Sequence, residues 1–139
     1  GRRILFVEDF GGLVPTDAEV GSLVRAAANA FATAGCTVEE GTIDTSDLRE
    51  IIAGTRAFGM VGRYGELIGA HRESMTAPLV NQIEAAMTLG VAEIAAAERM
   101  RTLYWHRIRK LFERFDYIIA PAVGIPAFRL DRPLPAEVN

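Results

Sequence analysis

The apolar run from Tyr117 to Ala120 constrains the fold of this chain more than any other stretch. It contains no charged residue and is bounded by Asp116 on one side and Pro121 on the other. A short run of this kind is typical of a strand that is covered on both faces, as in a parallel sheet. Pro121 should end the strand because it has no N–H to donate to a neighbouring strand. The run therefore predicts an α/β fold.

Two further segments have strand patterns and complete the predicted sheet. Ile4–Val7 is a continuous apolar run, whereas Cys36–Glu40 alternates between the two faces, as expected near a sheet edge. Ile4–Val7, the helix that follows and Cys36–Glu40 form a strand–helix–strand unit, and the connection between its parallel strands should be right-handed. We expect an α/β fold with a partial, mainly parallel sheet of three strands flanked by helices. The expected order is Cys36–Glu40, Ile4–Val7, Tyr117–Ala120.

Helical periodicity fills most of the chain between these strands. Thr16 and Glu19 form a predicted capping box, and Leu23 and Phe31 lie on the apolar stripe that follows, so both are expected in the core. A glycine-rich segment should either pack closely or bend at Gly59–Gly65, because glycine weakens a helix interior. The expected helices are Thr16–Ala34, a glycine-rich one that begins at Asp44–Asp47, Thr76–Leu89 and Val91–Phe115.

The loop after the predicted third strand is the first candidate binding site. In open α/β sheets, ligands bind outside the carboxyl ends of the strands. Gly and Pro residues hold this loop in an irregular conformation. The candidate substrate-binding residues are Pro121, Ala122, Gly124 and Pro126. A plain exit loop from a core strand is the alternative interpretation.

Arg56 and Phe58 are two further candidates for substrate binding, because they stand beside the predicted bend. The alternative for both is ordinary packing and solvation, and Arg56 could instead pair with Asp47 or Glu50. No residue is assigned as catalytic or as a metal ligand. Cys36 is expected to be a small buried side chain, and neither of the two histidines has a neighbour at i+4 that could share a metal ion.

A dinucleotide-binding site is a weaker hypothesis for the start of the chain. A predicted strand, two glycines, a helix and then acidic Glu39 or Glu40 fit its outline. The glycine spacing is not G-x-G-x-x-G, and three residues separate Gly12 from the helix. Backbone N–H groups at the helix start could not hold a pyrophosphate in that arrangement.

Four stretches together resemble the amidase signature hydrolases. Residues 115–121, Phe-Asp-Tyr-Ile-Ile-Ala-Pro, followed after a short gap by Pro-Ala-Phe, resemble a late strand and loop of that family. The other stretches are Arg3–Val7 with Gly11–Pro15, Ala34–Glu40 and Leu134–Asn139. Their order and spacing fit along essentially the whole chain. The resemblance covers the part of the family that lies C-terminal to its Gly/Ser-rich signature.

That resemblance implies an enzyme that hydrolyses a carboxylic amide with a Ser-cis-Ser-Lys triad and no cofactor. The triad itself is not found in these residues. The serines are Ser22, Ser46 and Ser74, no two of them adjacent, and Lys110 is the only lysine. We therefore expect a C-terminal-half fragment of an amidase, inactive alone, whose substrate in the intact enzyme is a small amide.

Composition sets the remaining expectations. The net charge of −3 gives no electrostatic case for a nucleic-acid partner. No signal peptide and no bilayer-length apolar run are found, so we expect no membrane partner and a cytoplasmic location. Residues 1–139 should form one domain with an extended tail at 129–139, and exposed apolar surface could cause self-association. Two alternatives remain open: a free-standing small-molecule-binding α/β module, and a structural or regulatory subunit that completes another chain.

Overall fold

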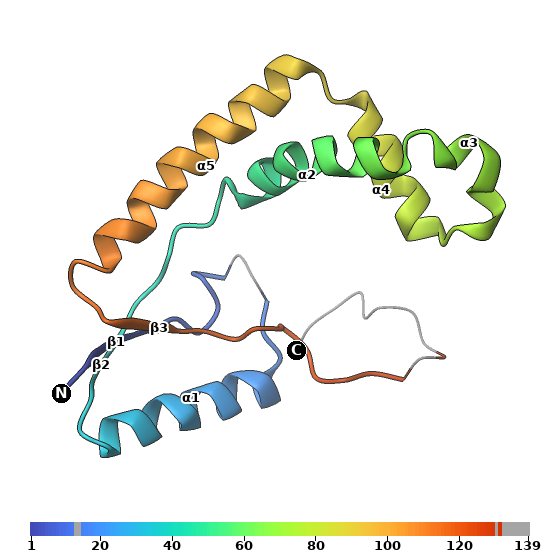
Figure 1. Ribbon diagram of the computed structural model, residues 1–139. Coiled ribbons are helices and arrows are strands. Elements are labelled where there is room, and N and C mark those ends of the chain that lie inside the picture. The colour runs from blue at the N-terminus through green and yellow to red at the C-terminus, as the bar shows by residue number, and fades with distance from the viewer. Residues whose placement is uncertain (13–14, 130, 132–139) are drawn as a thin grey trace. The chain divides into compact units, whose positions relative to one another are not determined.

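The computed structural model describes residues 1–12, 15–129 and 131, and the chain divides into two compact units (Figure 1). The first unit comprises Gly1–Thr45 and the residues from Ile108 onward, and the second comprises Ser46–Arg107. Each unit is described by itself below. The single domain expected over residues 1–139 stays a prediction, and the tail expected at 129–139 lies outside the described residues except for positions 129 and 131.

A three-stranded parallel sheet organises the first unit, as predicted. Its strands are β1 (Arg3–Phe6), β2 (Thr37–Glu40) and β3 (Tyr117–Ile119), in the order β2-β1-β3. In the register, Arg3 pairs with Thr37 and Ile4 with Tyr117. The predicted α/β class, strand order and direction are confirmed, and no strand boundary differs from the predicted one by more than a single residue.

One core cluster of this unit lies on one face of the central strand. Leu5 and Val7 point to the same face because side chains alternate along a strand, and they form a buried cluster with Ile43 and Phe115. Burying an apolar side chain of this size contributes about 1.5–3 kcal/mol to folding. Ile118 packs against the cluster from β3 but is only half-buried.

The expectation that β3 is covered on both faces is wrong for the described residues. Ile118 and Ile119 are both half-buried, and Tyr117 is exposed. The reason lies in the strand order: β3 is an edge strand, whereas β1 is paired on both sides and buries Ile4, Leu5 and Phe6. An apolar run fits either position, so it does not separate a central strand from an edge strand.

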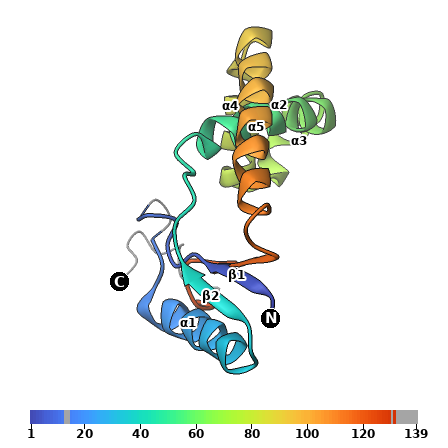
Figure 2. The same ribbon diagram turned by 90° about the vertical axis from the view of Figure 1, so that its left-hand side faces the viewer.

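Helix α1 (Ala18–Thr33) lies along one face of the sheet (Figures 1 and 2). Its N-cap is Asp17, whose Oδ1 accepts a hydrogen bond from the N–H of Glu19 at 2.9 Å, and not Thr16 as predicted. Aspartate is a preferred N-cap residue because its side-chain oxygen satisfies one of the free N–H groups at the helix start.

The predicted core face of α1 is also wrong. Leu23 and Phe31 are 65% and 48% exposed, and the buried residues of the helix are Gly21 and Ala28. Small side chains let the helix approach the sheet closely, whereas the apolar stripe read from the sequence points largely to solvent. Helical periodicity identified a helix here but not the face that packs.

The second unit is helical. Its elements are α2 (Leu48–Tyr64), α3 (Leu67–His71), the short 3₁₀ helix η1 (Arg72–Ser74), α4 (Ala77–Thr88) and most of α5 (Val91–Leu111). α2 packs along α4, and a buried cluster of Ile68, Val80 and Ile83 lies in this unit. No helix in the described part of the chain is both long enough and apolar enough to cross a bilayer.

Of the two expectations for the glycines of α2, close packing is found at one glycine. The helix runs through Gly59 and Gly62 without a break, ends at Tyr64 and is followed by Gly65. Close packing occurs instead at Gly54, where an added Cβ would overlap the Cβ of Ala97 on α5. The helix is unbroken at Gly59 and Gly62 and ends inside the range Gly59–Gly65 in which a bend was expected.

Helix α5 ends four residues before the predicted boundary at Phe115. The N–H groups of Glu113 and Arg114 bond to the carbonyls of Lys110 and Leu111, three residues back, which tightens the chain out of the α-helix. Phe115 can then turn into the core beside Val7. The apolar periodicity continued past the helix end because Phe115 is buried by the sheet.

Candidate functional site

The carboxyl edge of the sheet is the candidate site in the first unit. Because all three strands are parallel, the loops after Phe6, Glu40 and Ile119 leave from the same edge. The N–H of Val7 donates to the carbonyl of Ile119 at 2.9 Å. A hollow of about 280 Å³ opens here, lined by Phe6, Glu8, Asp9, Glu40 and Gly41.

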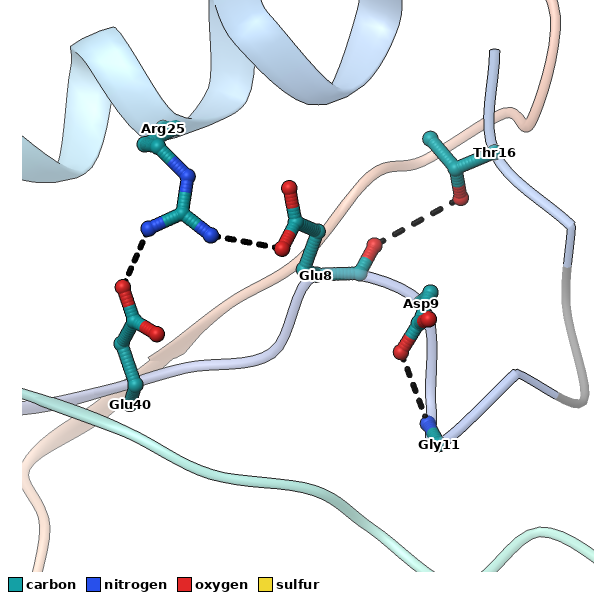
Figure 3. A network of polar contacts seen from close by, with 6 residues as sticks. All are labelled: Glu8, Asp9, Gly11, Thr16, Arg25 and Glu40. Atoms are coloured by element: carbon teal, nitrogen blue, oxygen red, sulfur yellow. Dashed lines mark hydrogen bonds and ion pairs between the residues drawn. The ribbon is translucent and has the colours of Figure 1, made fainter. Parts of the chain in front are cut away.

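Arg25 of α1 joins two carboxylates at this edge (Figure 3). Its Nη2 lies 2.6 Å from Oε2 of Glu8, and its Nη1 bonds to Oε1 of Glu40. The hydrogen bonds with Glu40 and Glu8 raise the pKa of the Arg25 guanidinium. The same guanidinium lies over the ring of Phe6, 5.1 Å from its centroid. Arg25 therefore fixes α1 to the ends of β1 and β2.

A tight turn follows β1 and forms one rim of the hollow. Asp9 Oδ1 accepts a hydrogen bond from the N–H of Gly11 at 2.9 Å, and Asp9 O accepts one from Gly12 at 3.2 Å. Phe10, Gly11 and Gly12 have positive φ angles of 53°, 73° and 81°. Positive φ is uncommon for a residue with a Cβ, and Phe10 is held there while its ring packs against the core cluster.

The loop predicted to bind substrate leaves from the same edge and is fixed against the start of α1. The carbonyl of Gly124 accepts a hydrogen bond from the N–H of Asp17 at 2.7 Å. Pro121 and Gly124 are half-buried, whereas Ala122 and Pro126 are exposed. None of these four residues lines the described hollow. The loop therefore leaves from the predicted edge of the sheet. The hollow at that edge, however, is lined by the charged residues Glu8, Asp9 and Glu40 and not by the loop.

Arg56 and Phe58 belong to the second unit. Arg56 lines a groove of about 630 Å³ between α2 and α4, where its Nη2 donates to Oε1 of Gln82 at 3.3 Å. Phe58 is 81% exposed and borders a smaller hollow of about 370 Å³. The alternative pairing of Arg56 with Asp47 or Glu50 is not found among the described residues, and Asp47 instead accepts a bond of 2.6 Å from Nη2 of Arg107.

The polar residues at the sheet edge are arranged for charge pairing. Cys36 immediately precedes β2, so it lies at the amino edge of the sheet and away from the hollow. Lys110 and Ser22 are exposed on α5 and α1. Within residues 1–12, 15–129 and 131, no group of three or more His, Cys, Asp or Glu side chains is placed to hold a metal ion.

Sequence analysis missed the ion pairs of Arg25. From the sequence, Glu8 and Asp9 are interpreted only as the end of a strand, and Glu40 only as a strand residue and, with Glu39, as part of the outline of a dinucleotide site. A usable signal existed: two carboxylates follow or end adjacent parallel strands, and the crossover helix between them carries an arginine. In the structure, Arg25 forms an ion pair with Glu40, and this ion pair helps to hold α1 at the carboxyl edge of the sheet.

The fold is similar to that of a solved enzyme. The crystal structure of a bacterial aryl acylamidase of the amidase signature enzyme family aligns with 100% of this chain at a TM-score of 0.79 and 21% sequence identity. This chain spans 31% of the length of the acylamidase chain. At that identity the likeness shows the fold, a partial parallel sheet flanked by helices. No protein-family model matches the sequence, and no curated protein matches it either.

Proposed function

We propose that this chain is a C-terminal-half segment of an amidase that hydrolyses a small carboxylic amide. The observation that carries the proposal is the alignment of the whole chain with about a third of an aryl acylamidase, at a TM-score of 0.79. The four stretches that resemble the amidase signature hydrolases support it, because three of them lie on the observed strands and their loops.

The catalytic groups of such an enzyme would come from outside this chain. A Ser-cis-Ser-Lys mechanism needs a nucleophilic serine, a relaying serine and a lysine base within hydrogen-bond reach. The serines of this chain are scattered, and Lys110 is exposed on α5. The contribution of this chain would be the sheet, the fixed carboxyl edge and part of a binding wall, with no cofactor and in a cytoplasmic enzyme.

We further propose that the loop Pro121–Pro126 borders the substrate pocket of the intact enzyme. Its start on a sheet edge and its bond to Asp17 support a wall of fixed shape. Gly124→Val is a poor probe, because a Cβ at Gly124 would lie 2.5 Å from the carbonyl oxygen of Pro15. Ala122 is exposed and suits the test better. In the intact enzyme, Ala122→Leu should change KM or substrate preference without changing the melting temperature.

The isolated chain tests the main proposal. Purified protein should hydrolyse no member of a panel of aryl and alkyl amides, whereas the same chain joined to its upstream coding segment should be active. Cys36→Ala is the control for an unrelated thiol activity. Turnover by the isolated chain that disappears in Cys36→Ala would contradict the proposal, as would an upstream segment without paired serines. Activity only on addition of a separate chain would favour the subunit alternative.

A further inference from the structure

The groove between α2 and α4 has the size and lining of a small-molecule site. Its volume of about 630 Å³ falls within the range of roughly 300–1,000 Å³ that is usual for ligand pockets. Its apolar wall includes Ile52 and Met60 of α2 and Leu89 after α4. All its lining residues belong to the second unit. A ligand with an aryl or alkyl body could therefore bury apolar surface here.

Two arginines supply the charge of this groove. Arg49 and Arg56 both line it, and they are seven residues apart on α2, which places them on one face, two turns apart. Gln82 faces them from α4 and accepts the bond from Arg56. No aspartate or glutamate lines the groove. Its charge is therefore positive.

Three other arginines of the same unit have a carboxylate partner. Arg72 bonds to Glu84, Arg101 to Glu98, and Arg107 to Asp47. Within the described part of the chain, Arg49, Arg56, Arg63 and Arg99 of this unit have no such carboxylate, and of these four only Arg49 and Arg56 line the groove. An anionic ligand would supply one, and an arginine bonds a carboxylate through two parallel N–H groups.

We propose that this groove binds an organic monocarboxylate with an apolar aryl or alkyl body. Arg49 and Arg56 hold the carboxylate, and Ile52, Met60 and Leu89 contact the body. A neutral compound of the same shape leaves the guanidinium groups without a charged partner, whereas a small polar anion buries little apolar surface. The proposal stands apart from the proposed amidase activity, because it concerns binding by the second unit alone.

The test is a calorimetric titration of the 139-residue chain with 4-phenylbutanoate and, separately, with 4-phenylbutanamide. The acid should bind saturably and about tenfold more tightly than the amide, the ratio expected from a charge-assisted hydrogen bond. Arg49→Gln with Arg56→Gln should remove that preference. Arg99→Gln on α5 is the matched control, because Arg99 is exposed and does not line the groove, and it should bind the acid as the unchanged chain does.

A second variant tests the apolar part of the site. Ala85 lines the groove from α4 and is exposed, so Ala85→Leu should fill the space without unfolding the helix. It should weaken the binding of both compounds, and circular dichroism checks that each variant is folded. Equal affinity for acid and amide, no saturable binding of the acid, or equal losses in Arg99→Gln and the double variant would each overturn the proposal. Tighter binding of 4-phenylbutyl phosphate than of the acid would assign the groove to phosphate instead.

Discussion

At the scale of single residues, Asp116 fixes the register between β1 and β3 at the amino edge of the sheet. Its Oδ2 accepts the N–H of Arg3 at 2.8 Å, and its Oδ1 bonds to Nη1 of Arg2 at 2.9 Å. Its own N–H donates to the carbonyl of Arg3 at 2.8 Å. Asp116, which directly precedes β3, thus provides hydrogen-bond partners for both the N–H and the carbonyl of Arg3 at the start of β1.

The pKa of Asp116 leads to a prediction on stability against pH. The bond from the N–H of Arg3 and the guanidinium of Arg2 lower this pKa below the ordinary value of about 3.9. A carboxylate with a lowered folded-state pKa contributes stability above its unfolded-state pKa, and that stability is lost as the pH falls through the folded-state pKa. Asp116→Asn should therefore lower the urea midpoint at pH 7, and the difference should shrink below about pH 4.

Urea unfolding at a series of pH values measures this difference. Glu73→Gln is the control, because Glu73 is exposed and the described part of the chain gives it no ion pair. Its midpoint should follow that of the unchanged chain at every pH. A gap between Asp116→Asn and the unchanged chain that stays constant from pH 7 to about pH 3 would show that the lost hydrogen bond, and not the charge, carries the effect.

At the scale of elements, the glycines of α2 have different surroundings although they share one helix. An added Cβ at Gly54 would overlap Ala97 of α5, whereas at Gly59 and Gly62 it would meet nothing within 4 Å. Glycine costs about 1 kcal/mol against alanine in a helix interior. At Gly54 that cost is offset by the close approach of α5.

Alanine substitution should therefore have opposite effects along α2. Gly54→Ala should lower the free energy of unfolding by roughly 1 kcal/mol or more, because overpacking outweighs the gain in helix propensity. Gly59→Ala and Gly62→Ala should raise it by up to about 1 kcal/mol. Chemical denaturation of the three variants measures these changes. Stabilisation by Gly54→Ala would mean that α2 and α5 do not pack at Ala97.

The sequence predicts the strands of this fold better than it predicts how the helices pack. The strands and their order were predicted because continuous apolar runs and crossover helices leave few arrangements of a parallel sheet. The packed face of α1 was not, because Gly21 and Ala28 pack by being small, and hydrophobic periodicity weights Leu23 and Phe31 instead. At the candidate site, the loop was located from its place after a strand. The ion pairs of Arg25 were missed, although the sequence shows carboxylates at two strand ends and an arginine on the helix between them, because tertiary contacts decide which of these groups meet.

At the scale of the whole molecule, large apolar side chains remain exposed on both units. Leu23 and Phe31 are exposed in the first unit, and Phe58, Leu103 and Trp105 in the second. Scattered exposed apolar residues are normal on a monomer, but aromatic side chains that are half or more exposed are typical of surfaces that contact another chain or another part of the same protein. The chain spans 31% of the acylamidase that it resembles in fold.

We therefore predict that the isolated chain associates with itself. Burial of apolar surface contributes about 25 cal/mol per Å², so contacts between exposed aromatic side chains favour association when the rest of a parent enzyme is not there to cover them. Sedimentation velocity over a wide range of concentration should show species larger than a monomer. Phe58→Gln combined with Trp105→Gln should shift them towards the monomer, because these side chains are 81% and 58% exposed and their loss should cost the fold little. Asn81→Gln, an exposed polar change on α4, should leave the distribution unaltered. A monodisperse monomer at every concentration would instead support a free-standing module, whose apolar side chains need no cover.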